Sequence, residues 1–248
     1  MDENFLQSWN QAKQNEEQGH RFFREAKYHE AAEYHKKAAI LFKEALGIIN
    51  KEDKEIRERI LGNYHIEIAN SFHCLATEQF YKGDKTNALG YYQKAIQEQK
   101  NAIEDYEKLK KRETYQPELS LLKTTLHFYL TYENICLAQI AFLNENYPEA
   151  IEFFKIAEIH SNLEVEFILE AGDLTRSIRS RARNYYLRGQ ILRSEALAAL
   201  QKENKQEAKG KYLLASQAFE DAAKLYPKWN EYTELAEKTR KMGAALRE

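Results

Sequence analysis

Residues that form tight turns are scarce in this sequence. Among its 248 residues there are only 9 glycines and 3 prolines, too few for the many hairpins of an all-β fold. The glycines stand singly, so there is no glycine-rich loop that could cradle a phosphate. Ala, Leu, Glu, Lys and Gln dominate instead, and all five favour helices. The composition therefore predicts an all-α protein.

Signatures of catalysis and of metal binding are also missing. The sequence has no Gly-x-Ser-x-Gly elbow and no His-Glu-x-x-His helix, and its single Glu-x-x-His runs from Glu17 to His20. We therefore expect a non-enzymatic protein that uses no cofactor and no metal. Cys74 and Cys136 lie far apart among apolar neighbours, which favours two buried free thiols and a reducing cytoplasm.

Neither a strong net charge nor a long apolar run is present. The formal net charge is −2 and the isoelectric point is near 6.4, so the overall composition argues against a nucleic-acid partner. The most apolar window, residues 130–143, is interrupted by Glu133, Asn134 and Gln139, and it falls short of the ~20 residues of a membrane span. The first residues lack the pattern of a signal peptide. We expect a cytoplasmic protein without membrane contact.

What the sequence does contain is a repeated pattern of small and aromatic residues. The pattern reads Ala, three residues, a ring, two residues, Ala, which places all three on one face of a helix. A small residue stands twelve positions before each leading Ala. The four copies are Ala31, His35 and Ala38; Ala88, Tyr92 and Ala95; Ala150, Phe154 and Ala157; and Ala208, Tyr212 and Ala215, preceded by Gly19, Ala76, Ala138 and Ala196.

This pattern resembles the tetratricopeptide repeat (TPR) family, in which a small residue on the first helix of a hairpin packs against alanines on the second. The leading alanines are 57, 62 and 58 positions apart, against about 34 in that family, so the helices should be longer, at about 20–30 residues. The resemblance implies one TPR-like domain over residues 1–248, a stack of long antiparallel hairpins with about eight or nine helices. A helical bundle similar to the 14-3-3 proteins is the alternative.

Turn signals divide the chain into these helices. Gly83-Asp84, Thr114 to Pro117, Asn144 to Pro148 and Gly172-Asp173 are the clearest of them. The expected helices cover about residues 4–26, 28–50, 53–81, 85–112, 118–143, 149–171, 174–201, 205–226 and 229–246.

Arginines concentrate in the helix expected after Asp173. Arg176, Arg179 and Arg183 fall on one stripe of that helix, with Gln190 within the stripe and Arg193 toward its edge. A neighbouring arc is expected to face the core and consists of Ile178, Ala182, Tyr185, Gly189, Leu192 and Ala196.

The TPR resemblance adds the positions of a concave groove. In that family, fixed positions on the first helix of each hairpin line the groove. The corresponding positions here include Asn70, His73, Tyr132, Gln139, Gln190 and Arg193. The arginine stripe therefore continues the expected groove.

Arginines on a groove wall suit an anionic ligand, because the planar guanidinium pairs bidentately with carboxylate or phosphate. The resemblance then implies a scaffold or adaptor that binds a protein or peptide segment, acidic or phosphorylated. In the alternative interpretation the arginines pair internally with Glu164, Glu166 or Glu170, at roughly 0–1 kcal/mol per exposed pair. Two rival functions are a nucleic-acid or nucleotide-responsive binder that uses the same arginines, and a self-assembling structural protein such as a homodimer.

The repeat makes a prediction about stability. Replacing Ala88 or Ala150 with Leu should lower the free energy of unfolding by about 1–3 kcal/mol, because a larger side chain overpacks a close helix–helix contact. Thermal or urea unfolding of each variant measures the change. Unchanged melting curves for both variants would contradict the proposed register.

Overall fold

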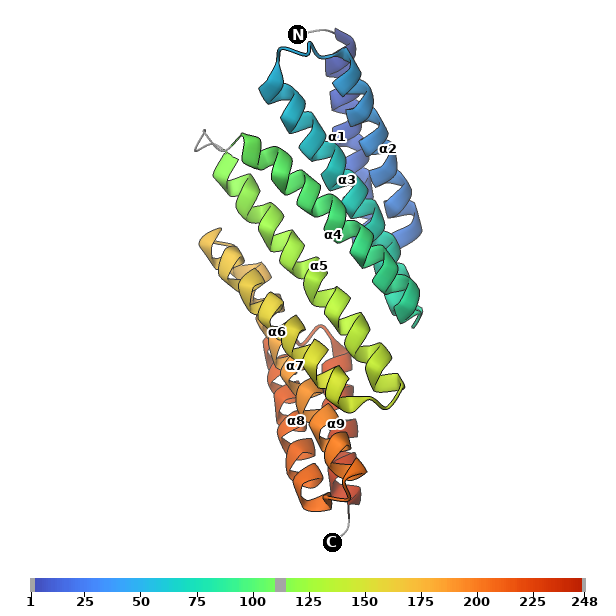
Figure 1. The fold of residues 1–248 in the computed structure, drawn as a ribbon, viewed down its shortest axis with the longest axis vertical. Helices are drawn as coiled ribbons and strands as arrows, with labels where there is room; N and C mark the ends of the chain where they lie inside the picture. Colours follow the sequence, from blue (N-terminus) through green and yellow to red (C-terminus); the bar gives the residue numbers. More distant parts are fainter. Residues whose placement is uncertain (1–2, 110–114, 247–248) are drawn as a thin grey trace. The chain divides into compact units, whose positions relative to one another are not determined.

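The computed structural model describes residues 3–109 and 115–246, and throughout these ranges the regular structure is helical (Figure 1). This confirms the all-α prediction. The expected helix boundaries agree with the structure to within a few residues, except that the expected end near Arg112 lies outside the described residues. The helices are α1 (Glu3–Arg24), α2 (Tyr28–Ile48), α3 (Lys54–Tyr81), α4 (Lys85–Lys108), α5 (Gln116–Leu143), α6 (Tyr147–Glu170), α7 (Leu174–Gln201), α8 (Lys205–Leu225) and α9 (Asn230–Ala245).

Two prolines lie inside helices that were expected to begin just after them. Pro117 is the second residue of α5, and Pro148 is the second residue of α6. The N–H groups of a first helical turn have no partner within the helix, so proline loses nothing there and its fixed φ suits the helix. Both helices consequently start two residues earlier than the sequence suggested.

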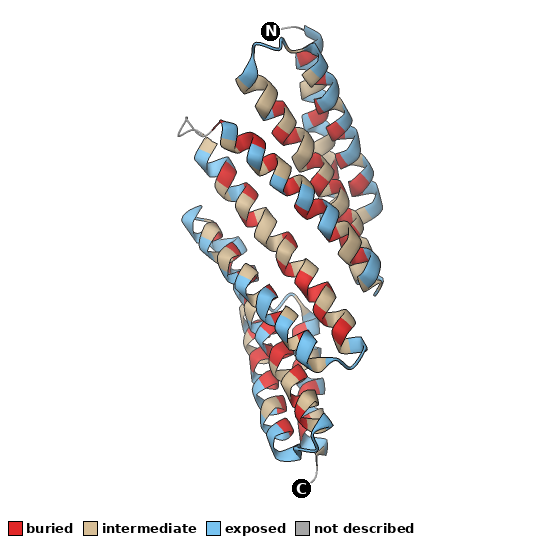
Figure 2. Cartoon of the chain, viewed as in Figure 1, coloured by how far each residue is buried: buried red, intermediate tan, exposed pale blue. Residues whose placement is uncertain are grey.

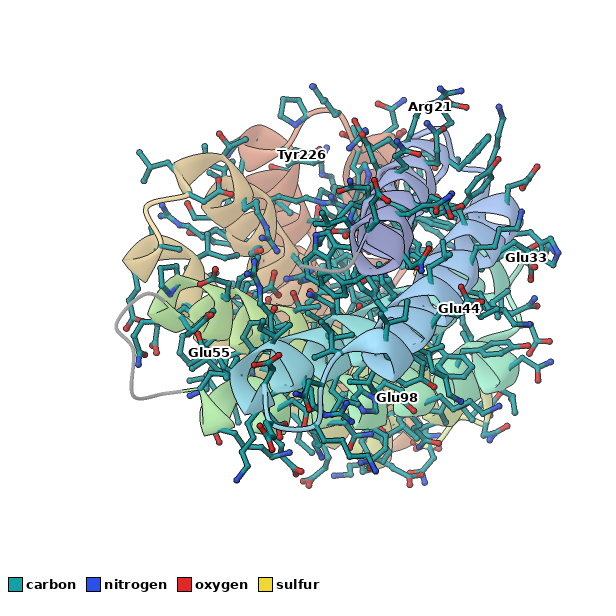
Figure 3. The ribbon with its side chains drawn as sticks, turned by 90° about the horizontal axis from the view of Figure 1, so that it is seen from above. Arg21, Glu33, Glu44, Glu55, Glu98 and Tyr226 are labelled. Atoms are coloured by element: carbon teal, nitrogen blue, oxygen red, sulfur yellow. The ribbon has the colours of Figure 1, made fainter. Side chains whose placement is uncertain are left out.

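The chain forms two compact units, Met1–Tyr129 and Leu130–Glu248, whose boundary falls inside α5. In the first unit α1 packs on α2, α2 on α3 and α3 on α4, and in the second α6 packs on α7, α7 on α8 and α8 on α9. Buried residues form stripes along these helices (Figure 2). Charged residues such as Arg21, Glu33 and Glu44 project outward (Figure 3). A single domain over residues 1–248 stays a prediction.

Five turns between helices share one geometry. Each contains a residue with positive φ, namely Ala26, Gly83, Glu145, Gly172 or Glu203. The N–H of that residue and the next N–H bond back to carbonyls of the preceding helix, as in a Schellman motif. At four of these turns an Asp or Asn follows, and its side chain accepts a hydrogen bond from the N–H three residues on, which caps the next helix. These caps are Asp84, Asn146, Asp173 and Asn204.

The turns determine which residues face each other across a hairpin. In each hairpin the small residue of the repeat lies seven positions before the positive-φ residue, and the central residue of the pattern lies nine positions after it. In the first hairpin these are Gly19 and His35, and a Cβ added to Gly19 would lie 2.7 Å from His35 Nε2. A shared turn therefore gives every hairpin the same register.

The same register continues along the hairpins by whole heptads. A Cβ on Gly62 of α3 would lie 2.5 Å from Tyr106 Cε2 of α4. A Cβ on Gly189 of α7 would likewise lie 2.5 Å from Phe219 Cε1 of α8. In each pair a buried ring covers a residue that has no side chain, so the two helices can approach closely. The sequence indicated the small residues correctly, but they lie under rings and not only against alanines.

Two glycines give a matched test of this packing. Gly189→Ala should destabilise the protein by about 1–3 kcal/mol, because the buried Phe219 ring has no room to move away. Gly210→Ala on α8 should be neutral or stabilising by up to about 1 kcal/mol, because nothing lies near its Cβ position and Ala favours helix. Urea unfolding of both variants measures the difference. Equal effects would show that the ring does not set the helix separation.

Candidate functional site

Helix α7 buries only part of the face that its apolar residues indicate. Ala182, Gly189 and Ala196 are buried, as expected. Ile178 and Tyr185, also expected in the core, are 43% and 38% exposed, so the expectation is wrong for these two residues. Ser177, Ser180 and Arg183 are buried instead. The neighbouring α6 carries a buried carboxylate, and a buried charge requires a charged or hydrogen-bonding partner. Pairing this carboxylate stabilises the protein more than burying the side chains of Ile178 and Tyr185 would.

The partner of the buried carboxylate is Arg183. Its Nη2 donates to Glu164 Oε2, and its Nε donates to Ser161 Oγ at 3.2 Å. Ser180 Oγ donates to the other oxygen of Glu164 at 2.9 Å. The Arg183 guanidinium also lies 5.6 Å from the ring centroid of Tyr132. Arg183 therefore makes the internal pair with Glu164 that the alternative interpretation named.

The residues around Arg183 stabilise its charged form. Burial by itself lowers the pKa of this guanidinium, but the Glu164 carboxylate and Tyr132 raise the pKa by more. Arg183 and Glu164 are only 5% and 3% exposed. This pair joins α6 to α7 in the interior and fixes the rotation of α7. The two arginines before it on the stripe, Arg176 and Arg179, face outward as a result.

Arg176 and Arg179 are exposed on the first turns of α7. The Arg179 guanidinium lies 5.6 Å from the ring of Trp229, the residue just before α9. Neither arginine has a carboxylate within ion-pair distance among the residues that the structure describes. These two side chains can donate hydrogen bonds to an anionic group, and Arg179 has an aromatic surface beside it. The sequence did not assign Trp229 to this place, because its contact depends on how α9 folds back.

Arg193, further along α7, has yet another environment. Its guanidinium lies 4.9 Å from the ring of Phe142, near the end of α5. Burial lowers the pKa of Arg193, and only tyrosines, among them Tyr186 and Tyr147, act against that effect. The side chain is half-buried, and no described carboxylate forms an ion pair with it.

The two glutamines of the expected groove lie beside Tyr186, which is itself a neighbour of Arg193. Gln190 is buried, and Gln139 is half-buried. Burial raises the pKa of the Tyr186 phenol, and the side chains of Gln190 and Gln139 beside it oppose this. The second unit thus brings Tyr132 to Arg183, and brings Gln139 and Gln190 to the surroundings of Arg193.

The remaining expected groove residues belong to the first unit, where they pack around Tyr129. Asn70 Oδ1 accepts from the Tyr129 hydroxyl at 3.3 Å, and Asn70 Nδ2 donates to Glu67 Oε1 at 3.4 Å. The His73 ring lies 5.1 Å from Tyr129 and 5.0 Å from Phe23, centroid to centroid. The polar atoms of Asn70 are therefore engaged internally. A role for Asn70 and His73 in ligand binding stays a prediction.

Aromatic residues near the arginines were the part of the site that sequence reasoning missed. These residues are Phe142, Tyr147, Tyr186 and Trp229. Their local sequence carries no signal of their proximity to arginine, because it arises only when α5, α7 and α9 pack. Within residues 3–109 and 115–246, no group of three or more His, Cys, Asp and Glu is arranged as a metal site. No helix in these ranges has the length and apolarity of a membrane span.

Comparison with known proteins gives no family for this chain. A comparison with protein-family models found no matching family, and a comparison with curated proteins found no matching sequence.

The buried pair gives a double-mutant prediction. Arg183→Met should lower the free energy of unfolding by about 3–5 kcal/mol, because it leaves the Glu164 carboxylate buried and unpaired. Adding Glu164→Leu should recover most of this loss, since two apolar side chains of similar volume replace the pair.

Arg181→Met, at an exposed position on the same helix, is the control and should change stability by less than about 0.5 kcal/mol. Urea unfolding of Arg183→Met, Glu164→Leu, the double variant and the control measures the coupling. If the double variant were as unstable as the sum of the two single variants, the proposed direct pairing would be wrong.

Proposed function

We propose that this chain is a non-enzymatic adaptor that binds an acidic segment of a partner protein against α7. The observation that carries the proposal is that Arg176, Arg179 and Arg193 have no carboxylate partner in the described chain, whereas Arg183 on the same helix has one. Two exposed positive charges at the start of α7 and a half-buried one further along the helix are left for a ligand.

The chemistry of these side chains favours an acidic peptide. Arg176 and Arg179 are three residues apart, so their guanidinium groups leave the same face of α7. Each can hold a carboxylate through two parallel hydrogen bonds. Trp229, beside Arg179, supplies an aromatic surface for an apolar residue of the same segment. The combination of charge and ring suits a peptide better than a bare anion.

Other features support a binding role over an enzymatic one. The repeated hairpins resemble the TPR family, whose members hold peptides in grooves, although fold resemblance alone does not establish function. Cys74 and Cys136 are free and buried, as the sequence predicted. Burial raises the pKa of the Cys74 thiol, so the thiol stays protonated at neutral pH and is a poor nucleophile. Free thiols also support a cytoplasmic location.

The proposal is tested with two labelled peptide pools. One is a pool of 12-residue peptides with glutamate at every second position, and the other has glutamine at those positions. Fluorescence anisotropy should show binding of the acidic pool only, and Arg176→Glu with Arg179→Glu should weaken it about tenfold or more, because two charge-assisted contacts become repulsive.

The matched control is Arg181→Glu with Arg188→Glu, which makes the same change of charge at exposed positions on another side of α7. It should alter affinity less than about twofold, and far-UV circular dichroism should be the same for both double variants.

Equal weakening by both would indicate an unspecific charge effect and would contradict the proposal. Tighter binding of a single-stranded DNA of the same length, with affinity falling steeply as salt rises, would replace it with the nucleic-acid function.

A further inference from the structure

Arg193 differs from the other buried polar residues of α7 because one of its hydrogen-bond donors has no acceptor. Its Nε is buried and has no hydrogen-bond partner among the described residues. The same holds for the Tyr212 hydroxyl of α8 and for Gln139 Oε1 of α5. These three atoms come from three helices of the second unit. Elsewhere in that unit the buried polar side chain of Arg183 is fully engaged by Ser161, Ser180 and Glu164.

The three incomplete groups share one neighbourhood. Tyr212 and Tyr186 both act electrostatically on Arg193, and Gln139 lies beside the Tyr186 hydroxyl. Phe142, whose ring lies under the guanidinium, is one helical turn from Gln139. Among the described residues, Tyr212 therefore lies near Arg193, and Gln139 lies near it through Tyr186.

Leaving such groups without partners has a cost. An unsatisfied buried donor or acceptor gives up its hydrogen bonds to water and gains none in return, and native proteins rarely keep several such groups at one place. Arg193 also keeps its charge, because a guanidinium does not lose its proton near neutral pH. A group from outside the described chain that accepts from Arg193 and Tyr212 and donates to Gln139 would satisfy all three atoms.

The charge at this place limits what that group can be. The described charges acting on Arg193 include no second cation and no carboxylate. One positive charge matches a monoanion, whereas a phosphate dianion would leave excess negative charge in a half-buried place. A carboxylate accepts from both donors, and an amide N–H next to it can donate to Gln139 Oε1. At the C-terminus of a peptide the two groups flank one Cα, and in an aspartate or glutamate they belong to the same residue.

We propose that Arg193, Tyr212 and Gln139 form a subsite for one carboxylate of a bound peptide and for the amide N–H adjacent to it. The inference rests on the proposed function, because it assigns part of the same acidic segment to a defined place. Arg193 is half-exposed and has a long, flexible side chain.

The subsite is tested with small probes and a direct spectroscopic signal. The Nε–H group of Arg193 gives a signal in a proton–nitrogen correlation spectrum of the full chain, assigned by its loss in Arg193→Lys. N-acetylglycine, which has a carboxylate beside an amide, should shift this signal saturably. N-acetylglycinamide, its neutral counterpart, should leave it unchanged.

Two further probes separate the sources of the anion. N-acetylglutamate amide carries only a side-chain carboxylate, so a shift with this probe indicates an acidic residue as the source. A shift with N-acetylglycine alone indicates a chain terminus. If inorganic phosphate shifts the signal at lower concentration than either carboxylate, or if no carboxylate gives a saturable shift, the subsite as proposed is wrong.

Tyr212→Phe distinguishes a ligand contact from a structural one. It removes only a hydroxyl that has no partner in the free protein, so the melting temperature should stay the same or rise. Binding of N-acetylglycine should nevertheless weaken about fivefold, as expected for a lost hydrogen bond to a charged group. The control is Tyr106→Phe, whose hydroxyl donates to Asn63 in the first unit and which should leave N-acetylglycine binding unchanged. A loss of stability without loss of binding in Tyr212→Phe would overturn the assignment.

Failure of this inference can be told apart from failure of the proposed function. Acidic peptides that depend on Arg176 and Arg179 but leave the Arg193 signal unchanged would remove the subsite and keep the adaptor. A saturable shift at Arg193 without any binding of the acidic peptide pool would keep the carboxylate subsite and remove the adaptor.

Discussion

The close approach of the two helices in each hairpin is the constraint on which the rest of the structure depends. A turn with one left-handed residue, such as Ala26 or Glu203, fixes the register. That register places a glycine or alanine opposite a large buried side chain, as with Gly189 and Phe219. Because each turn is held by its own backbone hydrogen bonds, the register is decided locally. The contacts between α7 and α8, such as that of Gly189 with Phe219, follow from it.

Contacts between successive hairpins have a different character from those within them. In the first unit His35 of α2 makes a buried 2.7 Å contact with the Glu67 carboxylate of α3. In the second unit Arg183 of α7 is paired with Glu164 of α6. Apolar packing can slide or rotate at little cost, whereas a buried charge tolerates only its partner. Each unit thus uses small-on-large packing inside a hairpin and one buried polar pair between hairpins. The rotation of α7 is a consequence of the second pair.

Three arginines on α7 illustrate how surroundings decide the role of a residue. Arg183 is buried in an ion pair with Glu164. Arg179 is exposed to solvent beside Trp229. Arg193 is half-buried over the Phe142 ring, and no described carboxylate forms an ion pair with it. The arginine that stabilises the fold and the arginines proposed to bind a ligand therefore lie on the same helix. Only arginines that have no carboxylate partner within the protein are available to bind another molecule. Because these side chains are positively charged, the proposed ligand is an acidic segment.

The sequence by itself determined the helices and the hairpin register. Its turn signals at Gly83-Asp84 and Gly172-Asp173 and its spacing of Gly19, Ala88 and Tyr92 are local, and local hydrogen bonds and helical periodicity express them directly. It could not decide which arginine is buried, and it put Ile178 and Tyr185 on the wrong face. Which arginine is buried depends on Glu164, which lies on the preceding helix. The guanidinium of Arg183 loses its contact with water and gains the Glu164 carboxylate only when α6 and α7 pack.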